Sequence, residues 1–188
     1  MKYRADLNQS RRESIRLKEY DYGQPGAYFV TICTHRRVCL FGEAMEDGIV
    51  LNDMGKFVER EWMISSEIRQ EIQLDAFVVM PNHMHGIVVI CDHNPVGATG
   101  RSPLHSHHRT LPPKSLGSFV AGFKSSITKK INQLRATPGQ PVWQRNYYEH
   151  VIRNEIDLEE IREYIQNNPL KWLEDENHPD NIEKAMKS

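Results

Sequence analysis

The sequence predicts an α+β fold in which helices pack mainly on one face of an antiparallel sheet. Short runs rich in β-branched and aromatic residues at 28–33, 74–80 and 84–90 predict strands. Two longer segments, 53–71 and 115–135, place apolar side chains close to helical spacing. Closely spaced strands with long helices between them are typical of helices packed against an antiparallel sheet.

The first half of the chain predicts two strands and a helix. The strand at 28–33 (YFVTIC) is followed by polar residues, and a short second strand is expected at 48–51 (GIVL). A helix then runs over 53–71, and either Asn52 or Asp53 is of a residue type that caps helix N-termini.

Two apolar runs at 74–80 and 84–90 are separated only by the Pro-Asn-His sequence at 81–83. Because proline cannot donate to a central ladder, the pattern predicts an antiparallel hairpin or one strand broken by a kink. Both runs are apolar almost without interruption, so we expect them in the middle of the sheet.

The second half predicts a helix, an extended segment and a second helix. Apolar side chains follow one side of 115–135, and lysines follow the other. The segment 141–153 favours a strand or extended chain, and 156–167 predicts a helix that Pro169 ends. We expect the acidic segment from residue 174 to be loosely ordered.

Composition and charge indicate one domain with terminal segments. The chain has 188 residues and a net charge of −1, which by itself argues against a nucleic-acid binder. That total averages over blocks: residues 1–18 carry net +4 and residues 101–153 carry net +8. We therefore predict a basic arm at 1–20, a folded domain at 21–173 and an acidic tail at 174–188.

The loop and the cellular location follow from composition. Residues 92–114 are rich in Pro, Gly, Ser and His without periodicity, which predicts a flexible loop. No apolar run is long enough to span a membrane, and the N-terminus lacks the apolar core of a secretory signal. The three cysteines have no metal-binding spacing and favour reduced thiols, so we predict a cytoplasmic protein without a membrane partner.

Two histidines two residues apart are the sharpest chemical feature. In a strand, alternate residues point to the same face, so His83 and His85 present two imidazoles side by side while Met84 turns to the opposite face. Imidazole is a common metal ligand, and the pair is a candidate half-site. Chance pairs of this kind are frequent in a chain with nine histidines.

A tyrosine and an asparagine lie one helical turn apart at Tyr164 and Asn168. A phenol and an amide oxygen can then point into one site, and tyrosine can act as a covalent nucleophile. A tyrosine with its hydroxyl in water and an asparagine that helps end the helix explain the same pattern.

Basic residues with interleaved aromatic side chains extend over 114–153. Positive charge combined with stacking surfaces is how proteins hold single-stranded DNA, although a solvated helix face has the same composition. The residues that we predict to contact DNA, including two arginines after the first strand, are Arg36, Arg37, Lys124, Lys129, Lys130, Arg145 and Arg153.

These features occur together in one known family. YFVTICTHRR at 28–37, VVMPNHMHGIVV at 78–89, VWQRNYYEHVIR at 142–153 and EYIQNNPLKW at 163–172 carry the match. The chain resembles the IS200-like tyrosine transposases of the HUH superfamily, and within it the REP-associated tyrosine transposases. The resemblance covers roughly residues 20–173.

The resemblance implies a ferredoxin-like fold and a DNA strand-transfer reaction. It implies that Tyr164 attacks a phosphodiester of single-stranded or hairpin DNA, forming a 5′-phosphotyrosine and freeing a 3′-OH. It implies that His83 and His85 hold one divalent cation, Mg²⁺ or Mn²⁺. The position of the family's third ligand, often Gln, is occupied here by Asn168.

Four questions stay open at this point. Tyr147 and Tyr148 are rival nucleophiles, although alternation in an extended segment directs them to opposite faces. The protein is alternatively a domesticated relative that binds hairpin DNA or RNA without cutting it. A metal-dependent hydrolase would need a carboxylate near the metal, for which Asp75 is a candidate. The sequence does not decide between a monomer and a homodimer with the tyrosine helix supplied in trans.

Overall fold

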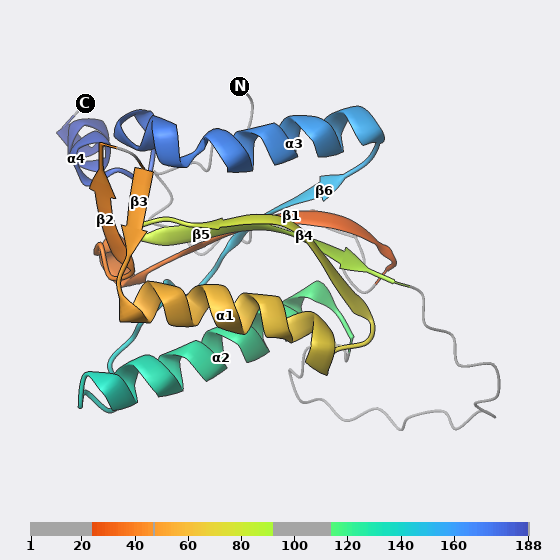
Figure 1. Cartoon of the computed structure of the whole chain (residues 1–188), viewed down its shortest axis with the longest axis horizontal. Coiled ribbons are helices and arrows are strands. Elements are labelled where there is room, and N and C mark those ends of the chain that lie inside the picture. Colours follow the sequence, from red (N-terminus) through yellow and green to blue (C-terminus); the bar gives the residue numbers. More distant parts are fainter. Residues whose placement is uncertain (1–23, 47, 92–113, 188) are drawn as a thin grey trace.

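The computed structural model describes residues 24–46, 48–91 and 114–187, and it confirms the α+β fold. One antiparallel sheet has the strand order β4-β5-β1-β6 (Figure 1). Its strands are β1 (Gly26–Cys33), β4 (Ile72–Val79), β5 (His83–Ile90) and β6 (Tyr148–Ile152). The predicted arm at 1–20 and the predicted loop at 92–114, except its last residue, lie outside the described residues.

The connections between the four strands give the sheet a ferredoxin-like topology. Helix α1 (Asp53–Ile68) connects β1 to β4, β4 turns directly into β5, and α2 (Leu116–Leu134) lies between β5 and β6. The first strand therefore sits between the third and the fourth, as a split β-α-β arrangement requires. The hairpin predicted around Pro81 is confirmed, and the proline lies in the turn, outside the ladder.

Helices cover both faces of the sheet. Helices α1 and α2 lie on one face, whereas α3 (Glu155–Asn167) lies on the other (Figure 1). The first face contains the larger core, in which Trp62 packs edge-on against Phe119 and Phe123. The second face buries Phe29 and Ile87 under α3. A sheet apolar on both faces requires a cover on each, and α3 supplies the second.

Side-chain caps begin the three long helices. The Asn52 side chain accepts hydrogen bonds from the backbone N–H groups of Met54 and Gly55 at 3.0 Å each, so Asn52 is the cap of α1. Ser115 caps α2, and Asn154 caps α3. Each cap satisfies backbone donors that have no partner within the helix.

A small second sheet differs from the expected element order. Strand β3 (Gly48–Leu51) forms where a strand was predicted, but it pairs with β2 (Gly42–Met45), which the sequence did not indicate. Three of the four residues of β2 are exposed, so no apolar alternation marks this strand. A short 3₁₀ turn, η1 (His35–Arg37), links β1 to this hairpin.

The segment after residue 174 is ordered, contrary to the expectation of a loose acidic tail. It follows a 3₁₀ helix, η2 (Pro169–Glu174), and ends in helix α4 (Pro179–Lys187). Trp172 is buried, and the buried Asp175 accepts a hydrogen bond from the backbone N–H of Asn177 at 2.6 Å. Because the segment is acidic in composition, the sequence does not indicate that these few residues are buried. They hold the segment against the sheet.

None of the helices in the described part of the chain has the length and apolar character that a membrane span needs.

Candidate metal centre and nucleophile

The two predicted metal ligands lie side by side at the start of β5. His83 and His85 point to the face of the sheet covered by α3, while Met84 between them is buried in the opposite core. Both imidazoles are almost completely buried, with exposed fractions of 0% and 2%. Their Nε2 atoms are 3.0 Å apart.

Hydrogen bonds outside the pair orient both rings. The Asn82 amide donates from Nδ2 to the carbonyl oxygens of Arg37 and Asn177, which leaves Asn82 Oδ1 to accept from His83 Nδ1 at 2.9 Å. Since Nδ1 of His83 carries the proton, its Nε2 presents a lone pair to the site. His85 Nδ1 lies 2.9 Å from the Thr31 hydroxyl on the neighbouring strand.

Burial keeps the two imidazoles neutral. Desolvation, and to a lesser extent the charge of Arg37, lowers the pKa of His83 to about 3. Desolvation and the neighbouring His83 also hold the pKa of His85 well below its ordinary value. A neutral imidazole is the form that can ligate a cation, so the pair is ready to do so at neutral pH.

Tyr164 extends from α3 toward the histidine pair. Its hydroxyl lies 3.4 Å from Nε2 of His85, and its ring meets the His85 ring edge-on with centroids 5.2 Å apart. Helix α3 is fixed on the sheet by Ile161 and Ile165, which pack against Phe29. Burial, followed by the charges of Asp175 and Glu176, raises the pKa of Tyr164 well above its ordinary value. The phenol is therefore protonated at rest.

A carboxylate that the sequence did not indicate completes the cluster. Asp175 is buried, and its Oδ2 lies 3.9 Å from Nε2 of His83. The ligating atoms of His83, His85 and Asp175 all lie within 4.8 Å of one another. Asn168 donates from Nδ2 to Asp175 Oδ2 at 3.0 Å, and its buried Oδ1 accepts no hydrogen bond from any described residue.

The donor set fits a divalent cation. Two ligands on bonds of about 2.1 Å at a right angle lie about 3.0 Å apart, which is the spacing of the two histidine Nε2 atoms. A buried amide oxygen without a partner is unfavourable unless a ligand satisfies it, and Asn168 Oδ1 is such an atom. Imidazole, amide and carboxylate groups are all metal-ligating groups, so the cluster could bind a metal ion.

The rival tyrosines lie on opposite faces of the sheet, as alternation predicted. Tyr147 packs against the core under α1 and α2, whereas Tyr148 packs on the α3 side. The rings of Tyr148 and Phe29 meet edge-on with centroids 6.3 Å apart. The Tyr164 hydroxyl, by contrast, lies 3.4 Å from the candidate ligand His85 Nε2. Asp75 is bound to Arg162 on α3 at 2.6 Å and is not part of the histidine cluster.

The residues predicted to contact DNA fall into separate places. Lys124, Lys129 and Arg145 line one cavity beside α2. Arg36 is exposed in η1, whereas Arg37 is half-buried and donates to the side chain of Asn177. Lys130 and Arg153 are exposed and do not line that cavity. Their contacts with DNA remain predictions.

A relative of nearly the same length shares much of the sequence. An uncharacterized protein from Haemophilus influenzae is 40% identical over 186 residues, which cover 95% of this chain and 98% of the relative. The chain belongs to the same family as this Haemophilus protein. No family model matches the sequence.

A solved structure shares the fold of the chain. The structure of a REP-associated tyrosine transposase bound to a REP hairpin superposes with a TM-score of 0.53 at 22% identity, covering 85% of this chain and 74% of that one. The resemblance to REP-associated tyrosine transposases is therefore confirmed at the level of the fold.

The sequence indicated His83, His85, Tyr164 and Asn168 as site residues. It did not indicate the residues that contact them, Thr31, Asn82 and Asp175. Thr31 and Asn82 carry a partial signal, because Thr31 lies in the first strand and Asn82 directly precedes His83. Asp175 carries none, since an acidic residue in an acidic segment is unremarkable. Its position depends on the fold of residues 169–187, which bring it back to the histidines.

Proposed function

We propose that the protein cleaves and rejoins single-stranded or hairpin DNA through a covalent bond to Tyr164. The observation that carries this proposal is the approach of the Tyr164 hydroxyl to His85 Nε2, 3.4 Å away, beside a second imidazole and a buried carboxylate. The fold shared with a REP-associated tyrosine transposase supports DNA as the substrate.

The reaction exchanges one phosphodiester for another. The Oη atom of Tyr164 bonds to the phosphorus, the bond from phosphorus to the 3′ oxygen breaks, and the DNA 5′ end remains on the tyrosine. The phenol proton is released, and the departing 3′ oxygen takes up a proton. A 3′-OH that later attacks the phosphotyrosine restores the phenol, so strand transfer needs no external energy source.

Neutral imidazoles and the buried carboxylate prepare the site for a cation. His83, His85 and Asp175, together with the amide oxygen of Asn168, would hold Mg²⁺ or Mn²⁺. Such an ion supplies positive charge to the scissile phosphate and orients it for in-line attack. Asn82 and Thr31 keep both rings aimed at that position.

The tyrosine acts in cis in this proposal. Helix α3 packs on the sheet of its own chain, and Arg162, two residues before Tyr164, is bound to Asp75 of β4. The nucleophile and the histidines thus come from one chain. This arrangement favours catalysis by a monomer.

The direct test is an adduct assay. The full chain is incubated with a library of single-stranded hairpin oligonucleotides, with Mn²⁺ or with a chelator, and the products are separated under denaturing conditions. We expect a protein–DNA adduct only with the metal ion, and none with Tyr164→Phe. Cleavage without an adduct would indicate a hydrolase, and binding without cleavage would indicate a domesticated DNA-binding protein.

A further inference from the structure

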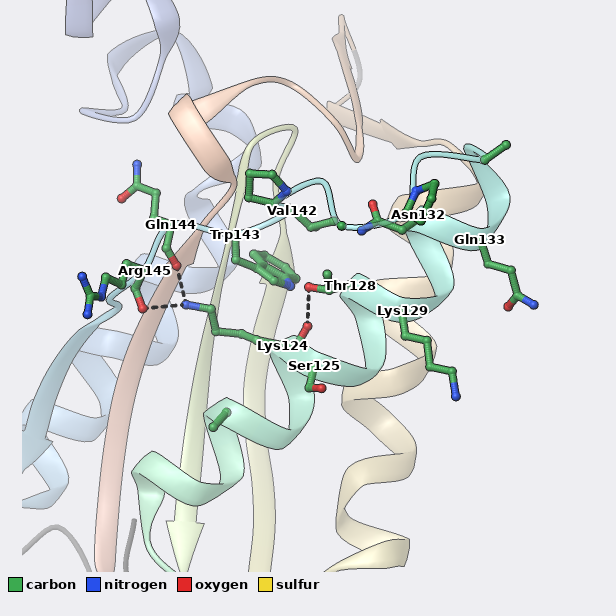
Figure 2. Close-up of a pocket in the computed structure, with 15 residues that line it drawn as sticks. Lys124, Ser125, Thr128, Lys129, Asn132, Gln133, Val142, Trp143, Gln144 and Arg145 are labelled. Atoms are coloured by element: carbon green, nitrogen blue, oxygen red, sulfur yellow. Dashed lines mark hydrogen bonds between the residues drawn. The ribbon is translucent and has the colours of Figure 1, made fainter. Parts of the chain in front are cut away.

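A cavity outside the histidine site opens beside the second half of α2. Its volume is about 940 Å³, within the range of small-molecule sites. One wall is α2, and the other is the chain from residue 136 to residue 145 (Figure 2). The proposed reaction does not use this cavity.

The side chains around the cavity are basic, apolar, or polar without charge. Three basic residues, Lys124, Lys129 and Arg145, line it, and none of the lining residues is acidic. The rest of the wall is partly apolar, with Pro138 and Pro141, and partly polar without charge: Ser125, Thr128, Asn132, Gln133 and Gln144. A nucleotide suits a basic and partly apolar lining, because its phosphate is anionic and its base and sugar present apolar faces.

A buried hydrogen-bond donor in the wall has no partner. Trp143 is 6% exposed, and its Nε1–H finds no acceptor among the described residues. The indole packs against Phe41 and Phe123, which fixes the ring. A buried donor without an acceptor is costly unless a bound group satisfies it, and a phosphate or base oxygen is such an acceptor.

Lys124 holds the two walls together. Its ammonium group donates to the carbonyl oxygen of Gln144 at 2.5 Å and also reaches that of Arg145 (Figure 2). The carbonyl oxygen of Asn146 is also within reach, at 3.3 Å. Partial burial lowers the pKa of Lys124 to about 8. Lys129 and Arg145, which are exposed, are the cations left to meet a phosphate.

The cavity and the histidine site lie on opposite faces of the sheet, both next to the end of β1 at Cys33. Trp143 packs in the core under α1 and α2, whereas Tyr164 packs on the α3 side. The wall of the cavity is nevertheless joined to β1, because Gln144 N–H donates to Cys33 O at 2.9 Å and Trp143 bridges to Thr34. Cys33 is in turn paired with His83.

We propose that this cavity binds one nucleotide of a single DNA strand outside the cleavage position. Lys129 and Arg145 contact its phosphate, and the indole Nε1–H of Trp143 donates to one of its oxygens. The strand then passes around the end of β1 from the cavity to Tyr164. The choice of DNA as the ligand rests on the proposed function, whereas the anionic nucleotide follows from the cavity itself.

The test measures binding of a labelled oligothymidylate of about 12 nucleotides, a length that one single-strand site can cover. Anisotropy titrations at several salt concentrations give the salt slope of affinity. Lys129→Gln should reduce that slope by about 1, because one phosphate contact is lost. Lys56→Gln, an exposed lysine on α1 outside the cavity, should leave it unchanged. Trp143→Phe should weaken binding about five- to tenfold, the usual effect of one hydrogen bond.

A photocrosslinking experiment tests the cavity separately from the proposed function. The oligonucleotide carries 5-iododeoxyuridine, and irradiation should crosslink it to peptides from α2 or from residues 136–145. Any of three results would overturn the inference. They are a salt slope in Lys129→Gln equal to that of the parent, crosslinks confined to other peptides, and tighter binding of the matching RNA. The adduct to Tyr164 is scored separately: adduct formation without pocket crosslinks removes only the pocket, and pocket crosslinks without an adduct remove only the proposed reaction.

Discussion

Asn82 and Thr31 orient the histidine pair through hydrogen bonds to the Nδ1 atoms of the two rings. Without a cation, one consistent chain of hydrogen bonds runs from the Thr31 hydroxyl through His85 and His83 to Asn82 Oδ1. In that chain His85 Nε2 carries the proton shared with His83. If His85 Nε2 held a cation, its proton would have to be on Nδ1, and the Thr31 hydroxyl would then accept from Nδ1 instead of donating to it.

Asp175 provides a prediction at the residue scale. Asp175→Asn should weaken Mn²⁺ binding by about 10- to 100-fold, because a charged oxygen next to His83 is replaced by a neutral amide. Calorimetric titration of the full chain with Mn²⁺ measures this directly. Asp180→Asn, an exposed carboxylate on α4, is the matched control. Equal Mn²⁺ affinity in the parent and Asp175→Asn would remove Asp175 from the site.

Residue spacing predicted which side chains share a face, but it did not by itself identify a site. His83 and His85 are two apart in a strand, and Tyr164 and Asn168 are four apart in a helix, so local periodicity places each pair on one face. Nothing local joins the two pairs, and the resemblance to known transposases supplied that connection. Asp175 depends on buried contacts of Trp172 and Asn177 that periodicity cannot indicate.

At the scale of elements, the hairpin of β4 and β5 must approach α1 closely. A Cβ atom at Gly86 would collide with the ring of Trp62, which is fully buried. Gly86 lies one residue after His85, so the same close approach fixes the strand that carries both imidazoles. A glycine is required there by space rather than by backbone conformation.

A pair of glycine variants tests this packing. Gly86→Ala should lower the free energy of unfolding by about 1–3 kcal/mol, because the indole must move to admit the methyl group. Gly122→Ala on α2 meets only the flexible end of Arg69 and should raise it by up to about 1 kcal/mol. Urea denaturation of both variants gives the comparison. A neutral effect of Gly86→Ala would show that the strand and α1 are not closely packed.

The ion pair between α3 and β4 gives a pH-dependent prediction. The hydrogen bonds from Arg162 hold the pKa of Asp75 below its ordinary value of 3.8. The stabilising effect is therefore complete above that value and is lost as the pH falls through the lowered pKa of the folded state. Asp75→Asn should lower the melting temperature at pH 7, and the difference from the parent should shrink in acid. Glu155→Gln, an exposed partner of Arg162, should have little effect.

At the scale of the whole molecule, the apolar runs predicted strands β1, β4 and β5. The run of β5 lies in the middle of the sheet as expected, but the expectation was wrong for β4, which is an edge strand and is only partly buried. The ferredoxin-like topology came from the resemblance, and the strand order confirms it. The sequence pattern did not predict strand β2 or helix α4, since their residues are largely exposed. The net charge of −1 was uninformative because it averages over sequence blocks of opposite charge.

Catalysis in cis is tested by mixing two inactive variants. Tyr164→Phe lacks the nucleophile, and His83→Ala lacks a metal ligand. Because both groups come from one chain in this fold, the mixture should form no adduct. Adduct formation in the mixture would show that α3 is exchanged between two chains, and the proposal of a catalytic monomer would then be wrong.

The most direct measurement for the central claim is identification of the residue that carries the DNA. The adduct formed with Mn²⁺ is digested with protease and nuclease, and the modified peptide is sequenced by mass spectrometry. The account predicts a nucleotide linked through its 5′ phosphate to Tyr164, with Tyr148→Phe forming the adduct as the parent does. A nucleotide on Tyr147 or Tyr148, or an undiminished adduct in Tyr164→Phe, would contradict it.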